Sequence, residues 1–313
     1  MGNGGAADFA WGLESWAKIW YNIGQIMRKQ VISLRAALFC VSAVALLIGF
    51  WGLILERAPH VFNAVEEDLS YGWLVPFVSL YVVWRERGKI AAAVGRPSVW
   101  GLCVALPFFV LGLMGSRGLQ VRFEIVAFAG LWWSLVWAFF GWGAAKEIIF
   151  PAAFLLFCIP LATFLDVITV HLRIFATSCA YGLLKGCGVD ILRRGTMLAM
   201  ADGSFGIDVA EPCSGLRSIF ALMALTAAYA YFTQPTWMRR GVLFVLSVPL
   251  AIMGNVTRIL TIVLVGKTCS ADFAMGFYHD YSGYVVFAVA ICLMVASGGL
   301  ITRMCEKGKG SRG

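Results

Sequence analysis

Apolar residues run in long blocks along most of this chain, and short polar stretches separate the blocks. A block of about 18 or more apolar residues is long enough to cross the hydrocarbon core of a bilayer as a helix. The pattern predicts about eight spanning helices, near residues 34–55, 71–86, 99–116, 123–141, 146–163, 213–232, 241–264 and 282–303. The predicted fold class is therefore an all-α membrane protein.

The N-terminal region has a different pattern. In residues 8–29, Trp16, Ile19, Trp20 and Ile23 recur at helical spacing, with polar residues and Lys18 between them. This spacing predicts an amphipathic helix that lies in the membrane interface, with tryptophan at headgroup depth. We expect three parts in the chain: the interfacial segment 1–33, a transmembrane domain over 34–303, and a basic cytoplasmic tail over 304–313.

Two segments between the fifth and sixth predicted spans need a separate interpretation. Residues 164–187 are apolar but carry four side chains that are costly in hydrocarbon, namely Asp166, His171, Arg173 and Lys185. A ninth span here would reverse the last three helices, so we expect a helix on the outer surface or a re-entrant element. Residues 190–198 and 205–209, around the turn 201–204, predict a small outer-face hairpin of two short strands.

Charge sets the expected orientation. Only 13% of the residues are charged, against about 25% in soluble proteins. The net charge of +8 comes from basic residues that flank the apolar blocks, including Arg85, Arg87, Arg239 and Arg240. The positive-inside rule then places both termini on the cytoplasmic side of the membrane. The same charges are expected to meet membrane lipid, and they indicate no nucleic-acid partner.

The nine cysteines form no CxxC pair, and the chain has only three histidines. This composition predicts neither a metal site nor a cofactor, and no dense disulfide framework. Cys179, Cys187 and Cys269 fall on the expected outer side, where one bridge among them is the alternative to free thiols.

Cys213 is the first candidate for chemistry, because it stands where a polar segment meets a long apolar block, after Glu211 and Pro212. Proline suits the first turn of a helix, and free backbone N–H groups at a helix N-terminus favour the thiolate, which is the nucleophilic form. The neighbouring Glu211 acts in the opposite direction unless Arg217 or Arg258 neutralises it. Packing of Cys213 as a small buried residue is the alternative.

The expected topology brings two further residues to the same side of the membrane as Cys213. Arg258 lies near the outer end of the seventh span, and His279 precedes the eighth. His279 suits a general acid and base, and Arg258 suits an oxyanion stabiliser, with Asn255 one turn before it. A simple anchoring role is the alternative for Arg258, and His60 and His171 also fall on the outer side.

Four segments resemble a known family. Glu211-Pro212-Cys213-Ser214-Gly215-Leu216-Arg217-Ser218 resembles the E-x-C-S-G-[IL]-R-S signature of the exosortase/archaeosortase family, and Asn255-Val256-Thr257-Arg258-Ile259 is similar to its N-x-x-R-I motif. The segment from His279 to Gly283 and Tyr284, with Phe287, is similar to the family's H-x(3)-G-[WY]-x(2)-F segment. The residues from Phe150-Pro151 to Pro160 are similar to its upstream helix. Pro212 replaces the family's common alanine, and Ser70-Tyr71-Gly72 stands where many members have Ser-His-Gly.

The resemblance implies a multi-pass membrane cysteine transpeptidase, with Cys213 as nucleophile, Arg258 as electrostatic stabiliser and His279 as acid and base. It implies exported proteins as partners, each with a C-terminal sorting signal made of a Pro-Glu-Pro-like motif, an apolar helix and a basic tail. We expect the substrate to be bound by Glu211, Ser214, Arg217, Asn255, Arg193 and Arg194. The last two meet either an acidic residue of the signal or lipid headgroups.

Two other classes of protein fit part of the pattern. One is a thiol-dependent membrane acyltransferase that uses lipid as the acyl donor. The other is a transporter or assembly scaffold without enzymatic activity, although few charges lie at mid-membrane depth, where a transport path needs them. The oligomeric state and the acceptor nucleophile are left open by the sequence.

Overall fold

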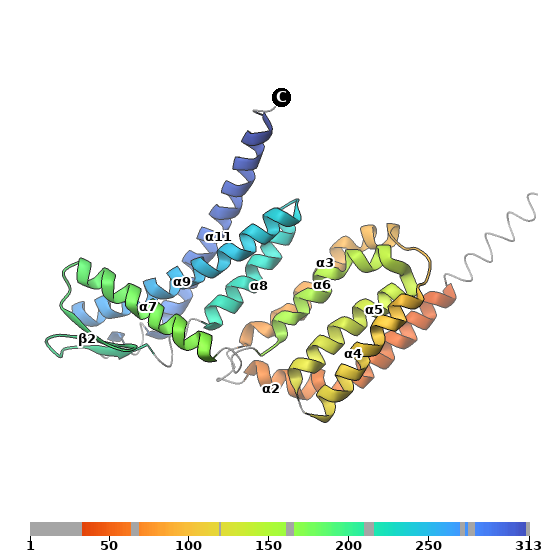
Figure 1. Ribbon diagram of the computed structural model, residues 1–313, viewed down its shortest axis with the longest axis horizontal. Coiled ribbons are helices and arrows are strands. Elements are labelled where there is room, and N and C mark those ends of the chain that lie inside the picture. The colour runs from red at the N-terminus through yellow and green to blue at the C-terminus, as the bar shows by residue number, and fades with distance from the viewer. Residues whose placement is uncertain are drawn as a thin grey trace, which may run out of the picture. The chain divides into compact units, whose positions relative to one another are not determined.

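A computed structural model describes residues 33–63, 69–118, 120–160, 166–209, 216–269, 273–274 and 279–310. These residues form helices and one small sheet (Figure 1). They divide into two compact units. The first unit contains residues up to Ala58 and Tyr81–Leu156, and the second contains Pro59–Leu80 and Phe157–Gly313. The predicted interfacial segment 1–33 lies outside the described residues except for Ser33.

The first unit is built on a close pair of helices, α4 (Val99–Arg117) and α5 (Val121–Glu147). Only three residues connect them, so they run antiparallel. Glycine allows the backbones to approach: a Cβ on Gly101 would lie 2.3 Å from the backbone nitrogen of Ala138. Small residues at such contacts are typical of helix pairs in membranes.

A glycine breaks α5 near its C-terminal end. Gly141 has φ 82°, a left-handed conformation that favours glycine, and a Cβ there would lie 2.6 Å from the carbonyl oxygen of Arg96. The loop after α3 (Leu74–Ala92) packs against this break, where the Gly95 N–H donates to the Phe140 carbonyl. The predicted helix 123–141 ends at this residue. The chain then continues through α6 (Ile149–Phe154) and the 3-10 helix η3 (Leu155–Cys158).

An ion pair joins two distant segments of the first unit. The helix Ser33–Gly49 bends by 53° into the helix Leu53–Asn63, which consists of the π-helix η1 (Leu53–Arg57) and α2 (Ala58–Asn63). Arg57 Nη1 donates to Glu124 Oε1 over 2.5 Å. The Glu124 side chain is only 1% exposed, so the pair is sheltered from solvent.

The second unit contains the sheet. It includes the 3-10 helix η2 (Ser70–Trp73) and, further along the chain, α7 (Asp166–Gly186). Three strands follow α7: β1 (Ile191–Arg194), β2 (Met197–Met200) and β3 (Gly206–Asp208). They pair antiparallel in the order β1-β2-β3. The prediction of two strands is wrong, because Gly195 at φ 63° reverses the chain within the predicted strand 190–198. The predicted turn over 201–204 connects β2 to β3.

Three long helices complete the second unit: α8 (Leu216–Thr233), α9 (Trp237–Thr268) and α11 (His279–Gly310). Ile259 and Ile262 of α9 are fully buried in a core that α7 and the sheet share. The ring of Phe205, next to β3, covers Gly266 of α9. The same helix also packs against α8 and α11. α11 continues through residues 304–310 of the predicted tail.

The cysteines on the expected outer side form no disulfide bond with one another. Cys179, Cys187 and Cys269 are all free thiols, so the alternative of one bridge among them is not realised.

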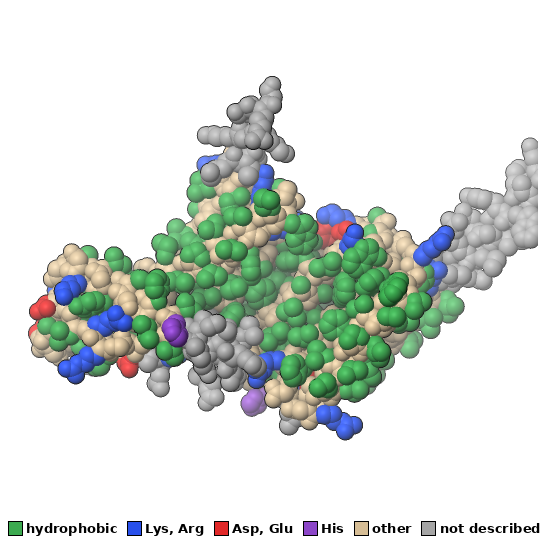
Figure 2. Space-filling model, viewed as in Figure 1, with side chains coloured by type: hydrophobic (Ala, Val, Ile, Leu, Met, Phe, Trp, Pro, Cys, Tyr) green, Lys and Arg blue, Asp and Glu red, His purple; other side chains and the backbone are tan. Residues whose placement is uncertain are grey.

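The protein is a multi-pass, predominantly helical membrane protein. Within the described residues, α4, α5, α9 and residues Tyr281–Arg303 of α11 are long and apolar enough to span a bilayer. Counting the bent pair Ser33–Gly49 and Leu53–Asn63 as one span makes five, which is fewer than the eight expected. Two apolar helices, Ile149–Cys158 and Ile219–Thr233, are shorter, and α3 carries several charges in its second half. Figure 2 shows hydrophobic side chains over much of both units, as expected for surfaces in contact with lipid.

Candidate active site

The candidate site lies in the three-helix part of the second unit. The short connection after Gln234 makes α8 and α9 antiparallel, and Thr236 caps α9 by accepting from the Arg239 N–H. α11 runs parallel to α8: Thr226 Oγ1 lies 3.0 Å from Met294 Sδ, and Gln234 Nε2 donates to the Gly298 carbonyl further along. The starts of α8 and α11 and the later half of α9 are therefore at the same end.

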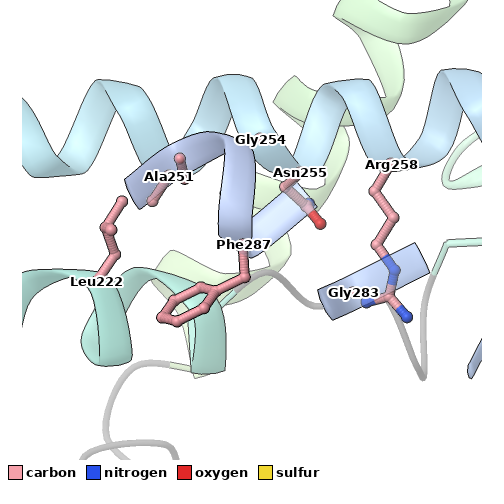
Figure 3. A pocket seen from close by; sticks show the side chains of 8 residues that line it. Leu222, Ala251, Gly254, Asn255, Arg258, Gly283 and Phe287 are labelled. Carbon is pink, nitrogen blue, oxygen red and sulfur yellow. The ribbon is translucent and has the colours of Figure 1, made fainter. Parts of the chain in front are cut away.

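A small pocket opens between these helices (Figure 3). Its volume is about 20 Å³, which is enough for one water-sized group. The walls come from one residue of α8, four of α9 and three of α11: Leu222, Ala251, Gly254, Asn255, Arg258, Gly283, Phe287 and Ala290. Apolar and small residues form most of the lining, and Asn255 and Arg258 supply the polar groups.

Arg258 reaches from α9 to the first turns of α11. Its Nε donates to Ser282 Oγ over 3.1 Å, and a Cβ on Gly283 would lie 3.8 Å from its Cζ. Arg258 is half-buried, whereas Ser282 is 1% exposed. In Figure 3, Arg258 extends from α9 toward the segment of α11 at Gly283, and Asn255 lies one turn earlier on α9. A guanidinium held in this way can stabilise an anion at the pocket.

α9, which carries Arg258 and Asn255, also packs into a core that it shares with α7 and the sheet. Val256 and Ile259, which flank Arg258 in sequence, are buried in that core. Val209, the last described residue after β3, is fully buried there too, and its N–H donates to the Thr196 carbonyl. The sheet thus holds the chain firmly at the point where residues 210–215 begin.

The structure describes part of the predicted site. Glu211, Cys213 and Ser214 lie outside the described residues. Residue 217 belongs to the first turn of α8, and residue 279 is the first residue of α11, one turn before Ser282; the side chains of Arg217 and His279 are outside what the structure describes. The predicted meeting of thiol, guanidinium and imidazole stays a prediction.

The other predicted residues fall at two places. Asn255 and Arg258 line the same pocket, together with Gly283 and Phe287 of the predicted histidine segment. Arg193 and Arg194 lie on β1, where successive side chains point to opposite faces of the strand. Arg193 Nε donates to the Gly195 carbonyl in its own turn, over 2.9 Å.

The structure adds residues that sequence reasoning did not name. Ser282 is the hydrogen-bond partner of Arg258, and Ala251, Gly254 and Ala290 leave the space of the pocket. A signal for Ser282 was present, because it lies within the histidine segment. In the part of the chain that the structure describes, no group of three or more His, Cys, Asp or Glu side chains is placed to hold a metal ion.

The pKa of Asp202, in the turn between β2 and β3, is clearly shifted. Ser204 donates to Asp202 Oδ1 through both its hydroxyl and its backbone N–H, over 2.6 and 2.9 Å. These hydrogen bonds favour the carboxylate and lower the pKa of Asp202. Asp202 is exposed in the β2–β3 turn, and both hydrogen bonds lie within that turn, so they stabilise it locally.

Comparison with known proteins identifies a family. The family described as transmembrane exosortase matches residues 62–296, which include all three predicted catalytic positions. The chain matches no curated protein and no solved structure.

Proposed function

The chain belongs to the transmembrane exosortase family, a class of membrane cysteine transpeptidases, and from this premise we propose its substrate and mechanism. The substrate is an exported protein with a C-terminal sorting signal: a Pro-Glu-Pro-like motif, an apolar helix and a basic tail. The enzyme cleaves the signal and passes the protein to an acceptor nucleophile or to water. The substrate's helix lies beside the enzyme's helices, and its basic tail stays on the cytoplasmic side.

One observation carries this proposal. Arg258 and Asn255 of one predicted motif and Gly283 and Phe287 of another line a single pocket, although they lie on different helices. Chain connectivity adds support for Cys213, which precedes Leu216 of α8 by three residues. A chain of three residues spans at most about 11 Å. This short connection supports Cys213 as the nucleophile, because the start of α8 lies at the end of the three-helix part where Arg258 meets α11.

In the proposed reaction the Cys213 thiolate attacks the carbonyl carbon of the scissile peptide bond. A C–S bond forms, and the carbonyl oxygen becomes an oxyanion that Arg258 stabilises, with Asn255 orienting the group. The C–N bond then breaks, and His279 gives the leaving amine the proton that it took from the thiol. The acceptor then attacks the thioester carbonyl while His279 takes its proton, the C–S bond breaks, and the thiolate is restored beside the protonated imidazole.

The remaining roles concern substrate binding and membrane arrangement. Glu211, Ser214 and Arg217 contact the substrate next to the thiol, and Arg193 and Arg194 meet the acidic residue of the signal. Eight spans place both termini on the cytoplasmic side of a bacterial inner membrane, with the site at the outer face. The basic residues at the cytoplasmic ends of the predicted spans support this orientation.

Co-expression of the full chain with a signal-bearing protein tests the proposal. Cys213→Ala and Cys213→Ser should both accumulate uncleaved substrate, whereas Cys292→Ser, at an exposed position on α11, should process it normally. Mass spectrometry of Cys213 in the wild type should find a peptide fragment. An acyl chain on Cys213 would indicate a membrane acyltransferase, and normal processing by Cys213→Ala would exclude the mechanism.

A further inference from the structure

The contact between Arg258 and Ser282 is a partly buried link between two helices that carry predicted catalytic residues. Arg258 Nε donates to Ser282 Oγ over 3.1 Å. Ser282 is 1% exposed, so water does not compete freely for its hydroxyl. Residue 279 begins α11 one turn before Ser282. The same hydrogen bond therefore joins Arg258 to the turn of α11 that contains the predicted acid and base.

The bond uses the atom that best controls the orientation of the side chain. A guanidinium is a rigid planar fork, and a partner at Nε fixes both the plane of the fork and the direction of its two terminal nitrogens. An arginine side chain without such a partner has considerable rotamer entropy to lose. Catalytic stabilisation of an oxyanion needs donors that are in position before the charge develops.

The chemistry of the partner matters as much as its position. A hydroxyl is neutral, so it orients the guanidinium without cancelling its positive charge. A carboxylate at the same place would form a charge-assisted pair and compete with a developing oxyanion for the same donors. A Cβ on Gly283, beside Ser282, would lie 3.8 Å from Arg258 Cζ, which shows that the guanidinium lies close to this turn of α11.

We propose that Ser282 is the positioning residue for Arg258, holding its guanidinium toward the pocket that Leu222, Asn255 and Phe287 help to form. This inference rests on the proposed function, because it assigns Ser282 to the step in which Arg258 stabilises the oxyanion. Ser282 does not touch the reacting atoms in this role. It acts through Arg258.

The first test measures cleavage of a peptide that carries the C-terminal sorting signal, by the purified full-length protein in lipid nanodiscs. Ser282→Ala should lower kcat roughly 10-fold to 100-fold, the range for one hydrogen bond to a charged group, and change KM less than about 2-fold. Ser282→Thr, which keeps the hydroxyl, should recover most of the rate. Ser297→Ala is the matched control, because Ser297 lies on the same helix and donates to the Leu293 carbonyl of its own turn.

A second test separates positioning from a general structural role. Arg258→Lys has an ammonium in place of the fork and no Nε–H, so adding Ser282→Ala to it should change kcat less than about 2-fold. An equal loss from Ser282→Ala in both backgrounds would overturn the proposal, and so would a normal kcat for Ser282→Ala alone. Failure of the proposed function has a different signature: Cys213→Ala would cleave the peptide as fast as the wild type.

Discussion

Two arginines in helical segments of this protein are held by different partners. Arg57, in the first unit, donates to the buried carboxylate of Glu124. Arg258, in the second unit, donates through Nε to the neutral hydroxyl of Ser282 and lines a pocket. Both are half-buried, so burial alone does not distinguish them.

The partner explains the difference in use. The carboxylate of Glu124 compensates the charge of Arg57, and its second oxygen, Oε2, is buried without a hydrogen bond among the described residues. The pair therefore serves to join the bent N-terminal helix to α5. In the proposed role, the hydroxyl of Ser282 orients Arg258 and, because it is neutral, does not itself compensate the charge of Arg258. An arginine that must stabilise a reacting group needs the second kind of partner.

Removal of Arg258 should have the largest effect on activity. Arg258→Ala should lower the cleavage rate by about 100-fold or more, the usual effect of losing one oxyanion donor. The amount of folded protein should stay near that of the wild type. Steady-state kinetics on the purified protein, with thermal unfolding as the control, measures both. A near-normal rate would remove Arg258 from the proposed role.

Removal of Arg57 should give the opposite result. Arg57→Ala leaves the Glu124 carboxylate buried without its partner, which costs about 3–5 kcal/mol of unfolding free energy. Cleavage per folded molecule should change little. Denaturant unfolding in detergent measures the unfolding free energy. The cleavage rate divided by the amount of folded protein measures the activity per folded molecule. A variant with wild-type stability and a large loss of activity would show that Arg57, like Arg258 in the proposal, acts in the reaction and not in holding the fold.

Replacement of both Arg57 and Glu124 tests whether the charges of the pair are needed for stability. Arg57→Met combined with Glu124→Met removes both charges and leaves unbranched apolar side chains, with methionine matching glutamate in length and being shorter than arginine. The double variant should recover to within about 1–2 kcal/mol of the wild type, because a buried ion pair adds little over apolar packing. Stability as low as that of Arg57→Ala would show that the charge itself is needed.

The smallest expected effect concerns a carboxylate in solvent. The pKa of Asp202 is lowered because the hydroxyl and N–H of Ser204 donate to it. A lowered folded pKa stabilises the turn above the unfolded pKa, and this contribution is lost as the pH falls through the folded value. The protection of the Ser204 amide against hydrogen exchange, taken relative to the intrinsic exchange rate at each pH, should fall at acid pH and in Asp202→Ala. Cleavage at neutral pH should change less than about 2-fold.

Local patterns predicted much of the helical framework. The predicted spans near 99–116 and 282–303 correspond to α4 and to a spanning part of α11, because a run of apolar residues is itself the requirement for crossing a membrane. The sequence makes Arg258 a candidate because a cation in an apolar block is costly and so indicates function. The break in α5 at Gly141 coincides with the end of a predicted helix.

Other features were missed for identifiable reasons. The predicted strand 190–198 contained a turn, because a single glycine in a strand pattern does not reveal a φ of 63°. Ser282 was not named, since a serine near a helix start has many ordinary uses. The salt bridge between Arg57 and Glu124 links residues far apart in the chain, which no local pattern connects.

The sequence alone determined the class of protein, the helical framework and the four segments that resemble the family, because hydropathy and short motifs are local properties. The tertiary structure decided which of those residues meet. Whether Arg258 faces Ser282 or the sheet depends on the register and rotation of α9 against α11, and these are set by packing across three helices. Partners of that kind, and the pocket between them, exist only after the helices have assembled.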